Sequence, residues 1–249
     1  MDIQNRIENY WEDAAPSFNS WIQYELGSFK KNAWMKLISK NIPANDRLEV
    51  LDIGTGPGFF AIIMSEMTHH VTAVDCSPNM IHYASHNAKQ AGVSPKFHMM
   101  DSHMLDFPDN QFDVVMCRNL TWTLKEPEKA YGEWKRVLKP GGTLLIFDAN
   151  WYLRFFNSEL NESFKEDMRR IEAMGLIDPY DYEDTQECDK ISLALPLSRQ
   201  YRPQWDLKVL QECGFTNIRQ NPDITELVWD EDEKIRYRST PLFMVRAQK

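Results

Sequence analysis

Short apolar runs alternate with longer amphipathic runs between residues 48 and 148. The apolar runs have the length of buried strands and lie at 48–53, 71–75, 95–100, 112–117 and 143–148. Between them, apolar residues recur at helical spacing, at 59–67, 78–91 and 127–138. This alternation predicts a mostly parallel sheet with helices on both faces. In such sheets, ligands bind beyond the carboxyl ends of the strands.

The N-terminal segment follows another pattern. Residues 1–28 mix aromatic and acidic side chains, which predicts one or two short helices interrupted at Pro16. These helices are expected to serve either as core packing or as a lid over a pocket. A helical stripe at 29–42 follows, and Pro43 ends it.

The C-terminal part breaks the alternation at 151–204. A helix is expected at 156–174, followed by an acidic, tyrosine-bearing loop at 178–184. This segment is interpreted either as an insertion packed over the ligand edge of the sheet or as a solvated loop. The remaining expected elements are a helix at 205–213 and an antiparallel pair of strands at one edge, at 215–220 and 241–247.

These elements predict an α/β fold with a Rossmann-like, mostly parallel, seven-stranded sheet. They form a single domain over residues 1–249. Its expected parts are an N-terminal helical lid (1–45), a ligand-binding core (46–150), a cap insertion (151–204) and a C-terminal helix with strands that complete the sheet (205–249).

The composition narrows the classes of partner. The 249 residues are 43% apolar, which suffices for a sizeable core, and carry a formal net charge of −9. The acidic balance argues against a nucleic-acid partner, because such proteins usually carry a basic stripe. No apolar run reaches the length of a membrane span, and the first residues lack the pattern of a signal peptide. A cytoplasmic location without a membrane partner is therefore expected.

Most isolated charges and thiols have simple interpretations. Lys30-Lys31, Arg169-Arg170 and the acidic run 230–233 are expected on solvated faces. The four cysteines are far apart and form no C-x-x-C pair. Cys76 and Cys117 lie at or just after expected buried strands, so they are expected as core or pocket-wall thiols. His82 and His86 share one helical face without a neighbouring acid or thiol, so no metal site is predicted.

The first expected strand ends in a glycine-rich turn, Asp52-Ile53-Gly54-Thr55-Gly56-Pro57-Gly58. Glycine allows the backbone to turn sharply and to approach a ligand closely, and the following helix directs its free N–H groups at that ligand. A dinucleotide fingerprint starting at Gly54 requires a glycine at 59, where Phe59 stands. A P-loop requires Gly-Lys-Ser/Thr, which is also missing.

The pattern D-x-G-x-G-x-G resembles the first motif of class I S-adenosylmethionine-dependent methyltransferases. The resemblance extends to 100–102, 105–108 and 112–113, and to the turn at 136–142 before the fifth strand. It implies S-adenosyl-L-methionine as cofactor and S-adenosyl-L-homocysteine as product. The cofactor-binding residues that it implies are Asp52, Gly54, Gly56, Gly58, Asp75, Cys76, Met80, Asp101, Ser102 and Asn119.

The resemblance also implies individual roles. Asp75 is expected to accept hydrogen bonds from the ribose hydroxyls, with a helix cap as the alternative. Asp101 is expected at the adenine amino group, and Asn119 at the amino-acid end of the cofactor. Met80 is expected either at the adenine ring or in the core.

Methyl transfer requires an acceptor held in line with the S–CH3 bond and protected from water. The candidate acceptor-binding residues lie beyond the fourth and fifth strands and in the N-terminal segment, and they are Tyr10, Trp11, Trp122, Asn150, Trp151, Tyr152 and Arg154. An aromatic and acidic pocket suits a cationic or amine acceptor, whereas Arg154 suits a carboxylate. No catalytic base is assigned, and the candidates are His103, Asp148 and Tyr152.

Within the family, the chain looks most like small-molecule methyltransferases of type 11, related to the quinone-biosynthesis C-methyltransferases. It lacks the Asn-Pro-Pro-Tyr type of signature after the fourth strand, where Arg118-Asn119-Leu120 stands. The prediction is a methyltransferase that acts on a small-molecule acceptor, without a nucleic-acid partner, as a monomer or homodimer. The alternatives are a cofactor-binding protein without transfer activity and a protein or RNA methyltransferase.

Overall fold

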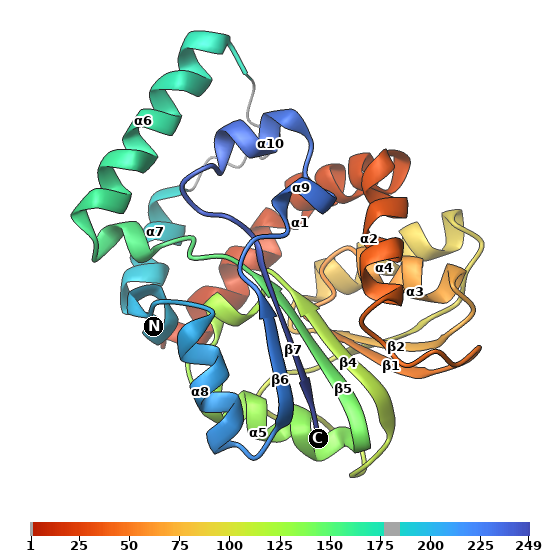
Figure 1. Ribbon diagram of the computed structural model, residues 1–249. Coiled ribbons are helices and arrows are strands. Elements are labelled where there is room, and N and C mark those ends of the chain that lie inside the picture. Colours follow the sequence, from red (N-terminus) through yellow and green to blue (C-terminus); the bar gives the residue numbers. More distant parts are fainter. Residues whose placement is uncertain (1, 177–184) are drawn as a thin grey trace.

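The computed structural model describes residues 2–176 and 185–249. A seven-stranded sheet lies between layers of helices (Figure 1). Its strands are β1 (Glu49–Ile53), β2 (His70–Asp75), β3 (Lys96–Met99), β4 (Phe112–Arg118), β5 (Leu138–Asp148), β6 (Thr216–Asn221) and β7 (Phe243–Gln248). The order across the sheet is β3-β2-β1-β4-β5-β7-β6.

The α/β fold predicted from the sequence is confirmed. The pairs from β3 to β5 are parallel, and β7 is antiparallel to both of its neighbours. The predicted antiparallel pair at one edge is therefore present, with β6 as the outermost strand. Strand β5 begins earlier than predicted, at Leu138, because the glycine-containing stretch before Thr143 continues the strand with a register shift.

The α-helices of the described residues are α1 (Ile3–Gly27), α2 (Phe29–Ser39), α3 (Phe59–Glu66), α4 (Pro78–Gln90), α5 (Pro127–Val137), α6 (Ser158–Met174), α7 (Thr185–Ala194), α8 (Gln204–Glu212), α9 (Thr225–Val228) and α10 (Glu231–Arg236). Short 3-10 helices are η1 (Thr121–Thr123), η2 (Leu153–Phe155) and η3 (Pro196–Arg199). None of the helices in these described ranges is long and apolar enough to cross a membrane.

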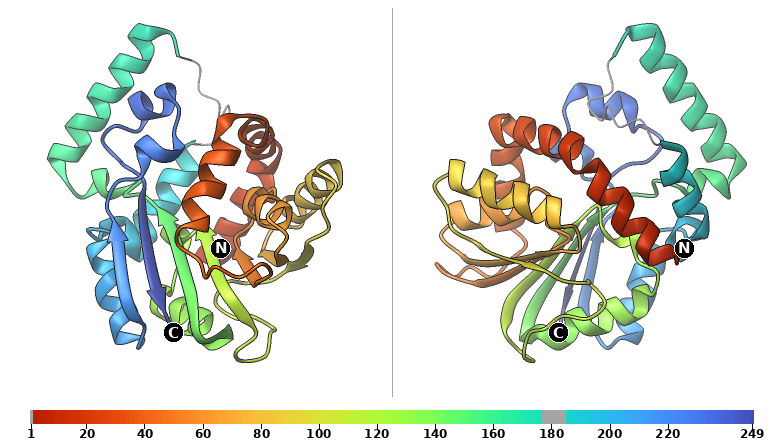
Figure 2. Two further views of the ribbon diagram at one scale, coloured as in Figure 1. Left: turned by 45° about the vertical axis from the view of Figure 1, so that its right-hand side comes forward. Right: turned by 180° about the vertical axis from the view of Figure 1, so that it is seen from behind.

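Helices cover both faces of the sheet (Figure 2), and the strands bury side chains on both faces. Val114 and Met116 of β4 pack in one hydrophobic cluster with residues of α1, α2, α3 and α9. Val115, between them in sequence, packs in a second cluster with residues of α5 and α8. Burial on both faces explains why the central strands read as continuous apolar runs rather than as an alternation of apolar and polar residues.

The prediction of an interruption at Pro16 is wrong. Helix α1 continues through Pro16, which lies inside it. A proline within a helix removes one backbone hydrogen bond and costs about 3 kcal/mol. The helix buries Ala14 and Ala15 before the proline and Trp21 and Ile22 after it. Tertiary packing on both sides thus outweighs the local preference to end the helix.

Lys30 and Glu233, which were predicted on solvated faces, are buried instead, whereas Glu231 and Asp232 are exposed as predicted. Lys30 of α2 is fully buried, and its Nζ lies 2.8 Å from Asp230 Oδ2 and 2.8 Å from Glu233 Oε2. The same ammonium lies 4.2 Å from the centre of the Trp21 ring. The partners are far apart in sequence, so no local pattern indicates the cluster. Arg169-Arg170 is exposed, as predicted.

The two longest helices of the segment 151–204, α6 and α7, pack against different parts of the molecule. Helix α6 projects from the body of the molecule and packs beside α10, whereas α7 packs against α1 (Figure 1). The acidic loop expected at 178–184 lies outside the described residues.

Candidate active site

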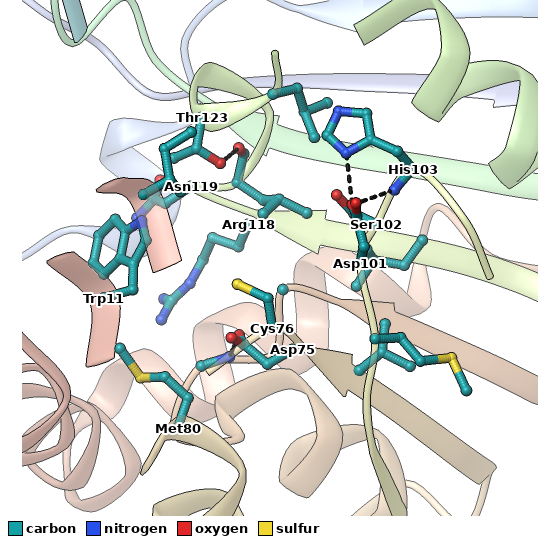
Figure 3. A pocket seen from close by; sticks show the side chains of 18 of the residues that line it. Trp11, Asp75, Cys76, Met80, Asp101, Ser102, His103, Arg118, Asn119 and Thr123 are labelled. Atoms are coloured by element: carbon teal, nitrogen blue, oxygen red, sulfur yellow. Dashed lines mark hydrogen bonds and ion pairs between the residues drawn. The ribbon is translucent and has the colours of Figure 1, made fainter. Parts of the chain in front are cut away.

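A pocket opens at the carboxyl ends of β1, β2 and β4, on the side covered by α1 (Figure 3). The chain reverses its direction of strand addition between β1 and β4, the place where open α/β sheets bind ligands. Including its mouth, the pocket encloses about 740 Å³, a size typical of small-molecule sites. Its lining residues are Gln4, Ile7, Trp11, Phe18, Ile53, Gly54, Gly56, Val74, Asp75, Cys76, Met80, Met100, Asp101, Ser102, His103, Arg118, Asn119, Leu120, Thr123 and Leu124.

The glycine turn between β1 and α3 forms part of the pocket wall. Gly54 and Gly56 have φ angles of +65° and +54°, which favour glycine. A Cβ atom at Gly54 would lie 2.7 Å from the Leu120 side chain, and one at Gly56 would lie 3.1 Å from the Phe18 ring. Side chains at these two positions would therefore displace other residues of the lining.

Two other residues of the motif support the turn without lining the pocket. Gly58 has a φ of +94°, and a Cβ there would lie 3.2 Å from the backbone of Ala84 in α4, so it permits close helix packing. Asp52 is buried and accepts a hydrogen bond of 2.6 Å from Thr55 Oγ1. Burial raises the pKa of the Asp52 carboxyl to about 7.

Asp75 joins the end of β2 to the glycine turn. Its Oδ2 accepts a hydrogen bond of 2.9 Å from the Gly56 N–H, and its Oδ1 accepts one of 3.0 Å from the Ser77 N–H. Ser77 in turn caps α4 by accepting from the Met80 N–H. Asp75, Cys76 and Met80 all line the pocket. Burial raises the pKa of the Cys76 thiol, so this group stays protonated at neutral pH.

The loop after β3 brings a second carboxylate to the pocket. Asp101 Oδ1 accepts a hydrogen bond of 2.8 Å from the His103 backbone N–H and lies 2.7 Å from His103 Nδ1 (Figure 3). The hydrogen bond from the His103 side chain lowers the pKa of Asp101. His103 is buried, and its Nε2 accepts a hydrogen bond of 3.4 Å from the Glu126 backbone N–H. Both ring nitrogens thus have partners within the protein.

Asn119, directly after β4, is held in an unusual conformation. Its φ angle is +54°, and its backbone N–H donates to the Phe147 carbonyl at 2.9 Å. Its side-chain Oδ1 is buried and receives no hydrogen bond from the described residues. An unsatisfied buried acceptor costs about 1–3 kcal/mol, so this oxygen is suited to a donor group of a ligand in the pocket.

Arg118 connects the end of β4 to α1. Its guanidinium makes a bidentate ion pair with Glu25, with distances of 3.0 and 2.6 Å, and lies 4.5 Å from the centre of the Phe59 ring. Both members of the pair are largely buried. The position of Arg118 directly after the fourth expected strand put it beside the expected site. No local pattern indicated its partner Glu25, which is distant along the chain.

Sequence reasoning missed most of the residues that α1 contributes to the pocket. Trp11 was a candidate, but Gln4, Ile7 and Phe18 were not, although all four line the pocket. The high aromatic content of 1–28 was the available signal. The Trp11 ring lies 5.7 Å from that of Phe18 and 6.1 Å from that of Trp122, centre to centre. Trp122 packs against Trp11 and does not line the pocket itself.

The polar cluster after β5, expected to contact an acceptor, does not line the pocket. Asp148 is fully buried and accepts hydrogen bonds from the Trp122 N–H at 3.0 Å, from Trp151 Nε1 at 2.8 Å and from Thr121 Oγ1. It also pairs with Arg202 at 3.0 Å. Asp148 therefore acts as an internal anchor for the residues around it.

The other candidates in this region also have internal partners. Asn150 bonds to the backbone of Arg202, and the Tyr152 hydroxyl bonds to the Cys188 thiol. Arg154 donates to the Trp151 carbonyl and to Asp189. Burial raises the pKa of Tyr152 well above its usual value. Tyr10 packs edge-on against Trp11 at 5.2 Å. None of these side chains lines the pocket.

The central part of the chain is similar in sequence to known proteins. Residues 51–146 match a family described as methyltransferase domain. The demethylmenaquinone methyltransferase of Leptospira interrogans is 33% identical over 137 residues, which cover 53% of this chain and 54% of that protein. Phosphoethanolamine N-methyltransferase 1 of Arabidopsis thaliana is 31% identical over 131 residues, which cover 51% of this chain and 27% of that protein.

A solved structure has a similar fold over the whole chain. It is phosphoethanolamine N-methyltransferase 2 of Haemonchus contortus, in complex with phosphomonomethylethanolamine and S-adenosylhomocysteine. The TM-score is 0.67 at 20% identity, with 100% of this chain and 60% of that chain covered. At this identity the likeness concerns the fold. The matched segments span between about a quarter and about half of the curated relatives' lengths.

The strand order with an antiparallel β7, the glycine turn after β1 and the family match over 51–146 together define one class of protein. Residues 51–146 carry a methyltransferase domain, and the chain has the fold of the class I S-adenosylmethionine-dependent methyltransferases.

Proposed function

We propose that this protein transfers the methyl group of S-adenosylmethionine to a small, uncharged acceptor bound beneath α1. One observation carries the proposal. The glycine turn, the carboxylates of Asp75 and Asp101, and the unpartnered buried Oδ1 of Asn119 all meet in one pocket.

These groups fit the parts of the cofactor. Asp75 accepts from ribose hydroxyls, Asp101 from the adenine amino group, and Asn119 Oδ1 from the ammonium of the amino-acid end. The glycine turn leaves room where a Cβ atom would intrude. When bound, S-adenosylmethionine supplies an electrophilic methyl group on a sulfonium sulfur.

The residues of the chain contribute orientation and exclusion of water. Trp11 and Ile7 from α1 line the pocket together with Leu120 and Leu124, and these apolar side chains exclude water from a bound acceptor. Both nitrogens of His103 are engaged in the protein, so no described lining residue is assigned as a base. The acceptor atom is therefore one that attacks without a base from the protein, such as the nitrogen of a neutral amine or the sulfur of a thiol.

Charge in the pocket favours an uncharged acceptor. Among the described lining residues, Arg118 is the only lysine or arginine, and Glu25 already pairs with it in bidentate fashion. A phosphate or carboxylate would therefore enter without a cation to meet it. The pocket lining also holds neutral polar groups, among them the Gln4 amide and the Thr123 hydroxyl.

Calorimetric titration tests the cofactor. We expect micromolar binding of S-adenosylmethionine and S-adenosylhomocysteine and none of NADH. Asp75→Asn should weaken binding by about 1.5–3 kcal/mol, because a carboxylate that accepts hydrogen bonds is lost. Asp106→Asn, at an exposed aspartate outside the pocket, is the matched control. Binding of NADH alone would overturn the proposal.

Transfer of a radiolabelled methyl group tests the acceptor. We expect transfer to members of a panel of neutral amines and thiols, and none to phosphoethanolamine. Transfer to phosphoethanolamine would contradict the charge argument, and transfer to RNA or protein would contradict the small-molecule acceptor. Tight cofactor binding with no transfer to any member would favour a binding protein without activity.

A further inference from the structure

The loop after β3 is braced from outside the pocket. The Trp134 indole N–H of α5 donates to the Ser102 carbonyl at 2.9 Å, and Glu133 Oε1 accepts from the Leu105 N–H at 2.8 Å. Within the loop, the Met104 N–H donates to the Asp101 carbonyl at 3.0 Å. The backbone from Asp101 to Leu105 is thus fixed before any ligand binds, and the His103 side chain is 4% exposed.

The contacts of His103 assign its tautomer. Its Nε2 faces the Glu126 backbone N–H, which is a donor only, so Nε2 is the acceptor nitrogen. The proton of the neutral ring is then on Nδ1, 2.7 Å from Asp101 Oδ1. His103 therefore donates to the carboxylate of Asp101 and does not accept from it.

The two donors of His103 converge on one oxygen of Asp101. The side-chain Nδ1–H and the backbone N–H both reach Oδ1, as the dashed lines in Figure 3 show. No described residue donates to Oδ2 of this carboxylate, and Asp101 lines the pocket. The arrangement fixes the rotation of the carboxylate and leaves its second oxygen as an acceptor for a ligand.

We propose that His103 is a positioning residue that sets the preference of the pocket for adenine over hypoxanthine in the nucleoside of its ligand. This inference rests on the proposed function, because it takes the base of S-adenosylmethionine as the group at Asp101. Adenine presents an amino donor at its sixth position, which Oδ2 accepts. Hypoxanthine presents a carbonyl oxygen there, which a fixed carboxylate repels.

The direct test measures the dissociation constants of S-adenosylhomocysteine and S-inosylhomocysteine by calorimetry. In His103→Ala, we expect the affinity for the adenine ligand to fall by about tenfold, because the carboxylate loses a charge-assisted hydrogen bond that orients it. The affinity for the inosine ligand should change less, so the preference shrinks. His103→Asn should restore the preference for the adenine ligand, because the amide N–H of the introduced asparagine can replace the Nδ1 donor. His86→Ala, at an exposed histidine of α4, is the control.

A second pair of variants keeps the test decisive if His103→Ala is unstable. Asp101→Asn retains an Oδ1 acceptor for His103, which then directs the amide N–H2 at the ligand. We expect this variant to prefer the inosine ligand. Adding His103→Asn to Asp101→Asn should keep that preference, whereas adding His103→Ala should remove it.

The outcomes separate this inference from the proposed function. An equal loss of affinity for both ligands in His103→Ala, or an Asp101→Asn protein that still prefers adenine, would show that His103 only stabilises the loop. Either result overturns the inference while leaving methyl transfer intact. Failure of transfer together with the expected binding preferences would overturn the proposed function and leave the role of His103 standing.

Discussion

Gly54 illustrates how a single residue shapes the pocket. Its backbone has a φ of +65°, and the space beside its Cα is bordered by Leu120. We expect Gly54→Ala to lose about 1–2 kcal/mol of stability, because the left-handed conformation disfavours a Cβ atom. The same Cβ should displace Leu120 and weaken binding of S-adenosylhomocysteine, measured by calorimetry.

Gly92 offers a matched control for that prediction. Its φ is +72°, but a Cβ atom there would have nothing within 4 Å, and it does not line the pocket. Gly92→Ala should therefore lose similar stability and keep its affinity for the ligand. Equal affinities in the two variants would show that the room beside Gly54 is not needed for binding.

Asp52 predicts a pH dependence of stability. Burial raises its pKa to about 7, whereas an unfolded chain gives an aspartate a pKa of ~3.9. Between about pH 4 and pH 7 the folded state binds more protons at this site than the unfolded state. The contribution of Asp52 to stability therefore falls as the pH rises through that range.

Urea unfolding at pH 5 and at pH 8 measures this effect. We expect Asp52→Asn to remove part of the loss of stability between the two values, because the amide does not titrate. Asp106→Asn, at an exposed aspartate, should leave the difference unchanged. The same pH dependence in Asp52→Asn and in the unmodified protein would refute the prediction.

At the scale of elements, α1 is attached to the sheet domain by polar contacts along its length. Glu12 accepts from Ser77 Oγ at 2.5 Å and from the Asn79 N–H at 3.1 Å, which holds α1 at the start of α4. Further along, Asn19 accepts from Asn87 Nδ2 at 2.8 Å. The ion pair of Glu25 with Arg118 ends the series. Because α1 covers the pocket, these contacts link the covering helix to α4 and β4.

Removing one partner of the ion pair should loosen α1. Glu25→Ala leaves the buried charge of Arg118 without its carboxylate, and we expect a loss of about 3–5 kcal/mol in the free energy of unfolding. Hydrogen exchange should rise more in α1 than in β4. Asp13→Asn, at an exposed position of the same helix, is the control. Uniform protection in Glu25→Ala would show that apolar packing alone holds α1.

At the scale of the whole molecule, a buried network ties distant segments together. Arg202 pairs with Asp148 at the end of β5 at 3.0 Å and with Asp206 of α8 at 2.8 Å, and donates to Thr121 of η1 at 2.6 Å. Asp206 also accepts from the Tyr131 hydroxyl of α5 at 2.5 Å. The network fixes η1, and with it the neighbouring pocket wall at Leu120 and Thr123.

Loss of Arg202 should affect the entire fold. Arg202→Met leaves two buried carboxylates unpaired, and we expect a loss of about 3–5 kcal/mol, read as a lower thermal midpoint. Adding Asp206→Asn should recover part of this loss, because one of those charges is removed. Arg199→Met, at an exposed arginine nearby, should have little effect. A wild-type midpoint for Arg202→Met would mean that the network adds nothing to stability.

The parts of the fold predicted from sequence are those with local causes. Apolar runs and helical stripes extend over a few residues, so the strands from β1 to β5 and their helices were identified within a few positions. The glycine turn is a local motif as well, and eight of the ten residues that the resemblance named for the cofactor line the pocket: Gly54, Gly56, Asp75, Cys76, Met80, Asp101, Ser102 and Asn119. Their individual roles stay predictions.

The features that the sequence did not reveal depend on contacts between distant segments. Lys30 can be buried because Asp230, just before α10, and Glu233 of α10 pair with it, and Asp148 is an internal anchor because Arg202 pairs with it. The type of a polar residue does not show whether its hydrogen bonds are made to water or to a buried partner.

The sequence by itself determined the sheet, the glycine turn and the class of protein, because these follow from short-range periodicity and from a motif with its own backbone conformation. Only the tertiary structure decided which polar residues face the pocket and which hold the molecule together. It placed α1 over the site, turned the polar residues after β5 inward and joined His103 to Asp101. The physical reason is that a buried charge or hydrogen-bonding group takes whichever partner the fold brings near it, and the chain does not record that partner locally.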